Sequence, residues 1–213
     1  SEIITNWEEL TKMKKPNNYE NTQVQGEFTP VEYGGHTLVI KQVEERTSKT
    51  GKPMIVVYFD FAKGDKQEGY FAEAFKNDIR PDKKWPNQAT QYILTEDNDG
   101  NCSRSFKTFL TCVEHSNTGF ETQWVDDFGK QFKNKFVGCV FGPQMDYYEG
   151  KEKEKRVLRW FISTDKVADA VIPAMSETQA YKNHINGYAQ GSTPAGDGFM
   201  NIPDGIDEEL PFN

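Results

Sequence analysis

The chain has few of the residues on which most enzymes rely. Only three cysteines and three histidines occur among its 213 residues, and they lie far apart in the sequence. There is no Cys-x-x-Cys or His-x-x-x-His pair, no Gly-x-Ser-x-Gly elbow and no Gly-x-x-x-x-Gly-Lys loop. These absences argue against a zinc site, a triad hydrolase and a nucleotide-binding loop. We therefore expect a protein that is not an enzyme and needs no metal or cofactor.

Long apolar runs are also missing. No stretch of about eighteen apolar residues occurs, and the N-terminal Ser1-Glu2-Ile3-Ile4-Thr5 has neither the basic nor the apolar part of a signal peptide. The scattered cysteines are typical of reduced thiols rather than of a disulfide framework. A soluble, cytoplasmic protein without a membrane partner is the expectation.

The negative charge is unevenly distributed. The net charge of −8 at first opposes a nucleic-acid partner, because binding to phosphates favours a basic surface. Residues 1–166, however, hold 24 basic and 26 acidic side chains, whereas residues 167–213 hold one lysine and seven acids. Most of the negative charge therefore lies in the C-terminal segment, and the rest of the chain can still present a basic face.

Composition divides the chain into three parts. The length and an apolar share of 36% fit one folded domain with appendages. Residues 1–35 are a polar N-terminal extension with a short possible helix at residues 6–10, and the domain is expected to span residues 36–175. Residues 176–213 are expected to form a flexible linker and an acidic tip, because their glycine, serine and proline content cannot support a core.

The pattern of the domain is mainly β. Residues 37–43 and 53–61 are rich in β-branched and aromatic residues and flank the turn 48–52, which predicts a hairpin, and residues 69–75 are a plausible third strand. Residues 76–104 are expected to be a long insertion loop with at most a short strand at 92–94. Apolar residues at helical spacing predict a helix over 105–115 and a short closing helix over 165–175.

Two further strands are predicted after the helix. They cover residues 136–148 and 156–163 and are joined by the charged turn 149–155. Three strands, a helical connection between strands 3 and 4, and two final strands match a five-stranded Greek-key OB-fold barrel. The predicted fold class is therefore mainly β: such a barrel with a long insertion loop and a flexible acidic C-terminal tail.

Binding of a single DNA strand needs exposed rings that stack on bases and cations that follow the phosphates. Alternation in the second strand places Tyr58 on the face of Asp60, which should point to solvent, so Tyr58 is expected to point outward. Alternation in 156–162 groups Arg159 with Phe161 and puts Trp160 on the core side. If the face of Arg159 and Phe161 is outward, they can grip a phosphate and stack a base. Alternatively, Phe161 is core and Arg159 only lies along it.

The other candidates lie on loops. Lysines occupy both turns that would flank the groove of an OB barrel, although three acids dilute the second set, and only one of Tyr147 and Tyr148 can be exposed. Trp85 either clamps a strand together with Lys84 or simply pins the insertion to the barrel. The predicted DNA-binding residues are Lys49, Lys52, Tyr58, Lys84, Trp85, Tyr148, Lys151, Arg156, Arg159 and Phe161.

The C-terminus ends in an unusual pattern. Three acidic residues precede an apolar Leu-Pro-Phe segment. A single aromatic ring at the end of a solvated acidic segment suits a shallow pocket with a basic rim on another protein. Proline restricts the backbone of the Leu-Pro-Phe segment. The predicted partner-binding residues are Asp207, Glu208, Glu209, Leu210, Pro211 and Phe212, with Asn213 as the last residue.

These features together resemble the single-stranded-DNA-binding proteins of phages and mobile elements of Gram-positive bacteria. The matching residues are the turn 48–52 with the strand ending Phe59-Asp60-Phe61, the segment Gly69-Tyr70-Phe71, the helix ending Glu114-His115-Ser116-Asn117, and the acidic Leu-Pro-Phe tip. Those proteins usually end on the phenylalanine, whereas here Asn213 follows. The resemblance implies sequence-independent binding of single-stranded DNA during replication, recombination or repair in a bacterial host cell, and recruitment of partner proteins by the tip.

Two rival interpretations remain open. In one, the domain is a β-barrel protein-interaction module, such as a phage structural or inhibitory protein, and its exposed rings face another protein. In the other, the protein is a metal-dependent nuclease. Such an enzyme needs a tight cluster of carboxylates, which the predicted strands do not supply. The sequence also leaves open a homo-oligomer.

Overall fold

A computed structural model of the chain describes residues 13–17, 19–21 and 29–187. The chain divides into two compact units, Ser1–Pro30 and Val31–Asn213. The described part of the first unit contains one turn of 3-10 helix, η1 (Tyr19–Asn21). The sheet, its helices and the candidate site belong to the second unit. The helix predicted at residues 6–10 and the predicted acidic tip lie outside the described residues.

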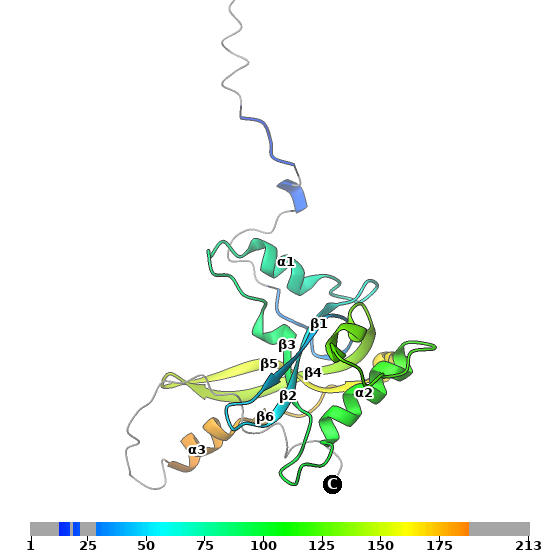
Figure 1. Cartoon of the computed structure of the whole chain (residues 1–213). Helices are drawn as coiled ribbons and strands as arrows, with labels where there is room; N and C mark the ends of the chain where they lie inside the picture. The colour runs from blue at the N-terminus through cyan, green and yellow to red at the C-terminus, as the bar shows by residue number, and fades with distance from the viewer. Residues whose placement is uncertain (1–12, 18, 22–28, 188–213) are drawn as a thin grey trace, which may run out of the picture. The chain divides into compact units, whose positions relative to one another are not determined.

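The second unit is built on a mainly antiparallel sheet (Figure 1). Its strands are β1 (Gly34–Thr47), β2 (Pro53–Phe61), β3 (Thr90–Leu94), β4 (Phe136–Tyr148), β5 (Lys151–Ile162) and β6 (Ser176–Glu177). Five strands lie in the order β3-β2-β1-β4-β5, and β6 pairs with β4 in parallel. Among the described strands β3 and β5 do not pair, so the sheet is open rather than closed into a barrel.

Short helices connect the strands. They are α1 (Tyr70–Asn77), α2 (Arg104–Ser116) and α3 (Gln179–Gly187), with 3-10 segments η2 (Asn87–Ala89), η3 (Phe128–Phe132) and η4 (Thr164–Asp169). The predicted helical connection between the third and fourth strands is confirmed as α2, which starts at the N-cap Ser103, whose side chain accepts a hydrogen bond from the Phe106 amide. No helix in the described part of the chain is long and apolar enough to span a membrane.

The core lies between the inner face of the sheet and α2. Ile55, Val57 and Phe59 of β2 are at most 1% exposed, as the predicted alternation requires. Phe109 and Val113 of α2 are completely buried on the other side of the core. Burying one such side chain contributes about 1.5–3 kcal/mol. The hydrophobic rows of β2 and α2 therefore fix how these two elements face each other.

The third strand predicted at residues 69–75 is wrong, because this segment forms α1. The expectation that Asp60 points to solvent is also wrong, since only 2% of Asp60 is exposed. Its carboxylate accepts hydrogen bonds from the backbone amides of Phe61 (2.8 Å), Phe71 (2.9 Å) and Ala72 (3.0 Å). Asp60 thus caps the first turn of α1, where free amide groups favour a negative charge. The third strand, β3, instead lies inside the predicted insertion loop.

Of the two alternatives for Phe161, the outward base-stacking position is wrong and the core position is confirmed. Phe161 is only 7% exposed and packs on Phe109 of the core, with ring centroids 5.1 Å apart. The cause is a bulge: Trp160 pairs with Val140, but the next pair is Leu158 with Phe141, so Arg159 is an extra residue in β5. Leu158 and Phe161 therefore both face the core, and Trp160, predicted to be core, is only half-buried outside the core cluster.

The C-terminal part of the domain also differs from the expectation. The closing helix expected over 165–175 is the short η4, followed by an extended segment with exposed Val171 and Ile172. Residues 176–187, expected to begin the linker, form β6 and α3. Most of the predicted charged turn 149–155 belongs to β5, and the turn itself is only Glu149-Gly150.

Candidate nucleic-acid interface

The outer face of β1, β2 and β3 carries two tyrosines. Tyr58 of β2 faces away from the core, as predicted, and Tyr92 of β3 pairs with the next outward residue of β2, Val56. Val56 is fully buried without belonging to the core cluster, so it forms an apolar floor on this outer side. We call Glu44, Arg46, Tyr58 and Tyr92 the tyrosine face.

Hydrogen bonds hold the tyrosine face in place. The Arg46 guanidinium donates to the Tyr58 hydroxyl oxygen (2.8 Å) and to Glu44 Oε2 (Nε, 2.9 Å). Burial raises the pKa of Tyr58 above its ordinary value, and Arg46 opposes this only in part. The hydrogen bond to Glu44 raises the pKa of Arg46. Tyr58 is thus a neutral, fixed ring, and Glu44 balances the charge of Arg46.

Two elements bound the tyrosine face. At one end α1 is tied to β2 through Asp60. At the other end is the β1–β2 turn with Lys49 and Lys52, in which the Ser48 hydroxyl accepts a hydrogen bond from the Lys52 amide (3.0 Å). Gly51 has a φ of 84°, a backbone conformation that favours glycine. The two predicted lysines therefore lie at the turn end of the tyrosine face, whereas the predicted Tyr58, two residues from Asp60, lies toward the α1 end. The Lys52 ammonium donates to the Asn98 side chain.

The β4–β5 hairpin forms a second candidate surface, which we call the hairpin arm (residues 143–156). Its two-residue turn has positive φ at both positions, as a tight hairpin turn requires. Tyr148, 60% exposed, pairs there with Lys151. Two acids of the arm are engaged: Glu154 accepts a hydrogen bond from the Tyr33 hydroxyl (2.7 Å), and Glu152 lies 3.2 Å from His184 Nε2. The predicted dilution of the lysines by acids remains, because residues 143–156 hold four basic and four acidic side chains and Lys155 is itself paired with Asp146.

Arg156 lies at the base of the hairpin arm, at the gap between β3 and β5. Its guanidinium stacks over the Tyr33 ring, 4.1 Å from the centroid, and donates to the Val31 carbonyl oxygen (2.7 Å). The Arg156 carbonyl accepts a hydrogen bond from the Gln88 side chain (2.7 Å), which links η2 to β5 across the open side of the sheet. The predicted Arg156 therefore places a fixed positive charge between the two surfaces.

Other predicted residues do not join either surface. Arg159 donates to the carbonyl oxygens of Pro143 (3.2 Å) and Ala174 (2.9 Å), so it holds the chain before β6 against β4. It forms no outward pair with Phe161, which is core. Trp85 is half-buried and its Nε1 donates to the Phe59 and Ala89 carbonyl oxygens (both 3.2 Å), which agrees with the interpretation that it pins the loop. Lys84 beside it is exposed.

Sequence reasoning missed Arg46, Tyr92 and Tyr33. The predicted first strand ended at residue 43, although no turn signal occurs before Ser48, so Arg46 was left outside it. Tyr92 was noted in a short strand, but its pairing partner could not be read from one sequence. Tyr33 was assigned to the N-terminal extension, and its contacts with Arg156 and Glu154 of the hairpin arm identify it.

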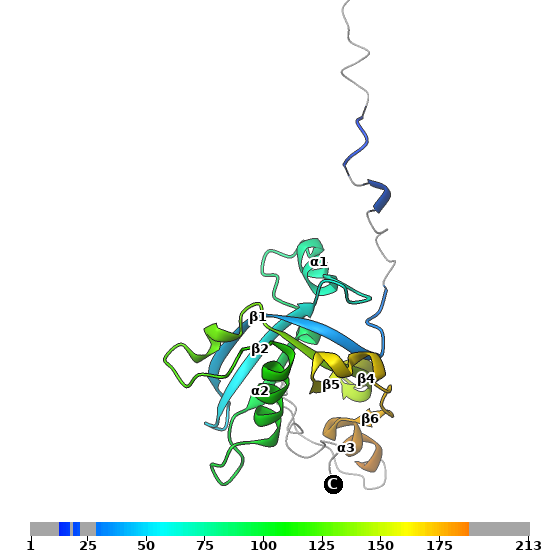
Figure 2. The same cartoon turned by 90° about the vertical axis from the view of Figure 1, so that its right-hand side faces the viewer.

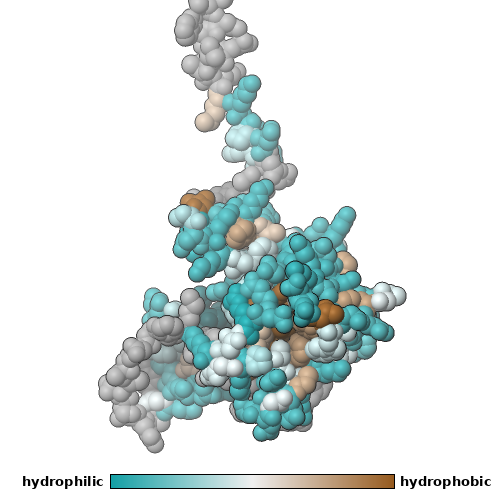
Figure 3. All heavy atoms as spheres, in the orientation of Figure 1, coloured by the Kyte–Doolittle hydropathy of each residue, from teal (hydrophilic) through white to brown (hydrophobic). Residues whose placement is uncertain are grey.

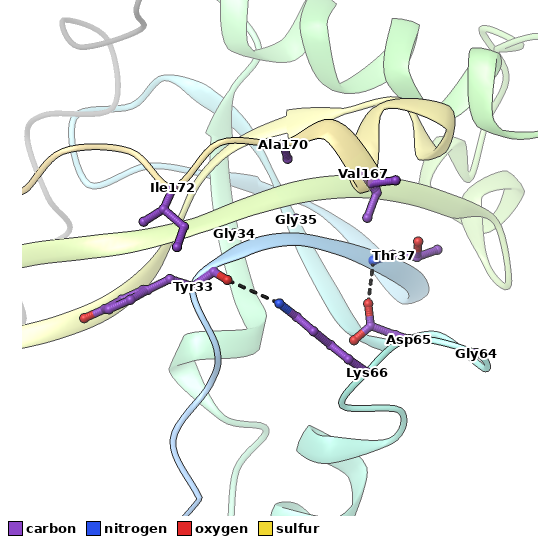
Figure 4. A pocket seen from close by; sticks show the side chains of 11 residues that line it. Tyr33, Gly34, Gly35, Thr37, Gly64, Asp65, Lys66, Val167, Ala170 and Ile172 are labelled. Atoms are coloured by element: carbon purple, nitrogen blue, oxygen red, sulfur yellow. Dashed lines mark hydrogen bonds between the residues drawn. The ribbon is translucent and has the colours of Figure 1, made fainter.

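A pocket of about 420 Å³ lies where the start of β1 meets the turn before α1 (Figure 4). Asp65 Oδ2 accepts a hydrogen bond from the Thr37 amide (2.8 Å), and Lys66 donates to the Tyr33 carbonyl oxygen (3.2 Å). Asp65 Oδ1 contacts His36 Nδ1 at 2.9 Å, and His36 is fully buried. These groups are engaged with one another, so the pocket is part of the framework that holds β1.

The described residues offer little for catalysis. No group of three or more His, Cys, Asp or Glu side chains among them could hold a metal ion. The three cysteines are free thiols, and burial raises the pKa of Cys112 to about 11 and that of Cys139 well above its ordinary value. These two thiols are therefore poor nucleophiles.

The outer surface is mostly polar on the face seen in Figure 3, where hydrophobic atoms form separate spots rather than one broad patch. A tyrosine face, a basic turn and a hairpin arm with equal numbers of lysine or arginine and acidic side chains are the groupings that the described part of the second unit offers to a ligand. No protein-family model matches the chain, and no curated protein matches its sequence. A function must therefore be argued from these residues.

Proposed function

We propose that the protein is an OB-fold protein that binds single-stranded DNA without sequence preference, in phage or mobile-element replication, recombination or repair. The observation that carries this proposal is the tyrosine face. Two rings on the outer side of neighbouring strands, in a sheet whose β1–β2 turn carries lysines, are the combination that stacks bases and follows phosphates.

The strand order supports the fold part of the proposal. A sheet in the order β3-β2-β1-β4-β5, with a helix between the third and fourth strands, is compatible with an OB fold whose third and fifth strands do not pair. The OB fold is a partly open barrel that binds oligonucleotides on strands 2–3 and on the loops after strands 1 and 4. Those positions correspond to the tyrosine face, the β1–β2 turn and the hairpin arm.

Binding is expected to proceed by stacking and charge. Successive bases stack on Tyr58 and Tyr92, while the lysines of the β1–β2 turn and of the hairpin arm contact phosphates. Arg46 exchanges its contact with Glu44 for a phosphate oxygen, because a guanidinium binds phosphate in the same bidentate way as carboxylate. Rings stack on every base, so no sequence preference is expected.

The acidic tip is proposed to recruit partner proteins through Phe212. Asp207, Glu208 and Glu209 are also proposed to compete with phosphates for the binding surface. Deletion of residues 204–213 should then tighten DNA binding at low salt and abolish partner recruitment. An unchanged affinity across a salt titration would remove the competition from the proposal.

A titration with a labelled oligo-dT, followed by fluorescence anisotropy, tests the proposal. We expect binding that weakens steeply as salt rises, similar affinity for mixed-sequence single strands, and weaker binding to a duplex of the same length. No binding of any single strand at low salt would refute the proposal and favour the protein-interaction module.

A further inference from the structure

The hairpin arm contains a ring that another part of the chain covers. Tyr147 of β4 is stacked by the imidazole of His184 in α3, with ring centroids 3.6 Å apart and planes only 10° from parallel. Figures 1 and 2 both show α3 beside the β4–β5 hairpin. A parallel ring at this distance makes the contact that a nucleobase makes on a tyrosine. His184 therefore occupies a position on Tyr147 that a base would suit.

Tyr147 lies on a face of the hairpin arm that is connected to Arg156. Successive residues of a strand alternate between its faces, so Tyr147 shares a face with Met145 and Pro143, and Pro143 pairs with Arg156. Arg156 in turn stacks on Tyr33 at the gap between β3 and β5. A strand leaving the tyrosine face across this gap would meet Arg156 first and would pass Glu154, which pairs with Met145, before it reached Tyr147 and its partner Glu152.

The cover is attached by polar contacts and by one ring stack. β6 pairs with β4 over two residues, and Thr178 donates to Asp146 Oδ1 (2.8 Å) through its hydroxyl and to the Met145 carbonyl oxygen (2.9 Å) through its amide. His184 Nε2 lies 3.2 Å from Glu152 Oε1. None of the residues of α3 is fully buried. An element with little buried apolar surface can detach at a small cost in free energy.

We propose that Tyr147 is a further base-stacking position and that α3 covers it until a nucleobase displaces His184. This inference rests on the proposed single-stranded-DNA binding. It makes α3 a cover that competes with DNA for one ring, while the tyrosine face stays open. Detachment of His184 leaves Glu152 without its partner, so the gain from stacking on Tyr147 is partly offset.

A double-mutant cycle tests the competition. His184→Ala should bind a labelled 20-nucleotide oligo-dT about three- to tenfold more tightly than wild type, because the base no longer displaces a ring. The gain should vanish in His184→Ala/Tyr147→Ala and persist in His184→Ala/Tyr147→Phe, which keeps the ring. Asn183→Ala, an exposed position on the same helix, is the matched control and should stay within twofold of wild type.

Hydrogen exchange on the unmodified protein gives an independent readout. Adding saturating oligo-dT should speed exchange of the amides of residues 180–187 several-fold while slowing exchange in β2 and β3. Unchanged or slower exchange in α3 would overturn the inference, as would an affinity gain from His184→Ala that survives without Tyr147. A purely structural role for the stack would lower the melting temperature of His184→Ala without tightening binding. If wild type binds no single strand at all, the proposed function fails first, and this inference fails with it.

Discussion

The tyrosine face and the hairpin arm carry the same kinds of side chain, yet they are held differently. On the tyrosine face, the rings remain accessible at half-burial and Arg46 is balanced within the face by Glu44. On the hairpin arm, the ring of Tyr147 is stacked by His184 from a separate helix. The rings of the tyrosine face are thus accessible, whereas a base could stack on this side of Tyr147 only if His184 moved away.

The difference follows from where each region gets its support. β2 is central in the sheet between β1 and β3, so the tyrosine face needs no further element to hold it. β5 is an edge strand, and the pairing of β1 with β4 ends at Gly34 and Phe141, so the hairpin arm projects from the sheet. A projecting hairpin exposes both faces, and α3 with β6 packs onto it. The open tyrosine face and the covered hairpin arm are therefore both consequences of the strand order.

The largest expected effect is a loss of oligo-dT affinity when the rings of the tyrosine face are removed. Tyr58→Ala/Tyr92→Ala should weaken oligo-dT binding by about 2–6 kcal/mol, because each stacked base contributes about 1–3 kcal/mol. Anisotropy titrations at constant salt measure this loss. Tyr58→Phe/Tyr92→Phe keeps both rings and should lose far less. Wild-type affinity in the double alanine variant would show that the hairpin arm, not the tyrosine face, carries binding.

The next effect tests the framework that both regions share. Asp65 ties β1 to the turn before α1, and Asp65→Asn should lower the free energy of unfolding by about 1.5–3 kcal/mol, because hydrogen bonds to a charged group are lost. Chemical denaturation at pH 7 measures this. Oligo-dT affinity at low denaturant should remain, since Asp65 belongs to neither region.

The pH dependence of stability should change in the same variant. Burial alone would raise the pKa of Asp65, but hydrogen bonds from His36 and from the Gln67 and Thr37 amides outweigh it and place the pKa below its ordinary value. A depressed carboxyl pKa contributes stability that is present above the unfolded pKa of about 4 and is lost as the pH falls through the folded pKa. Asp65→Asn should therefore flatten the acid limb of the stability curve. An equally steep acid limb in the variant would exclude Asp65 as its cause.

A smaller effect separates the charges of the two regions. Lys151→Gln/Lys153→Gln should reduce the slope of log K against log salt by about 1.4, because each phosphate contact on a single strand contributes about 0.7. Anisotropy at four salt concentrations measures the slope. Lys63→Gln/Lys76→Gln, at exposed positions outside both regions, is the control and should leave it unchanged. An unchanged slope in the hairpin variant would leave the hairpin arm out of the phosphate path.

The smallest effect sharpens the account of Arg46. Glu44→Gln should tighten oligo-dT binding about two- to fivefold, because Arg46 no longer exchanges a carboxylate for a phosphate and a negative charge leaves the face. Glu45→Gln is the matched control, since Glu45 pairs with Ile55 of the core-facing row and is not part of the tyrosine face. Equal gains in both variants would point to net charge alone rather than to Arg46.

Local patterns predicted those elements whose burial repeats without interruption. The core-facing row of β2 and the helical spacing of α2 were confirmed because each is one continuous apolar row, although Val56 and Asp60 of the predicted outward row of β2 are buried as well. The sequence left the face of Phe161 open and mispredicted that of Trp160, because one bulge at Arg159 shifts the alternation and a bulge leaves no mark in the pattern. Asp60 was misplaced because its partners are the amides of a helix that its own sequence neighbourhood does not indicate.

The sequence predicted the kinds of side chain that form the candidate site, but not all of the residues that form it. Tyr58, Lys49 and Lys52 follow from strand and turn signals within a few residues of one another. Arg46 with Glu44, and Tyr92 beside Val56, depend on the register of three strands, which tertiary pairing sets. The stack of His184 on Tyr147 joins residues 37 positions apart, and no local signal indicates it.

Photo-crosslinking of the wild-type protein to an oligonucleotide containing 5-iodouracil tests the central claim most directly. Mass spectrometry then identifies the crosslinked residues. We expect crosslinks at Tyr58 and Tyr92 of the tyrosine face, which decrease when salt or unlabelled oligo-dT is added. Crosslinks confined to other surfaces, such as the exposed Trp124, with none on β2 or β3, would contradict it.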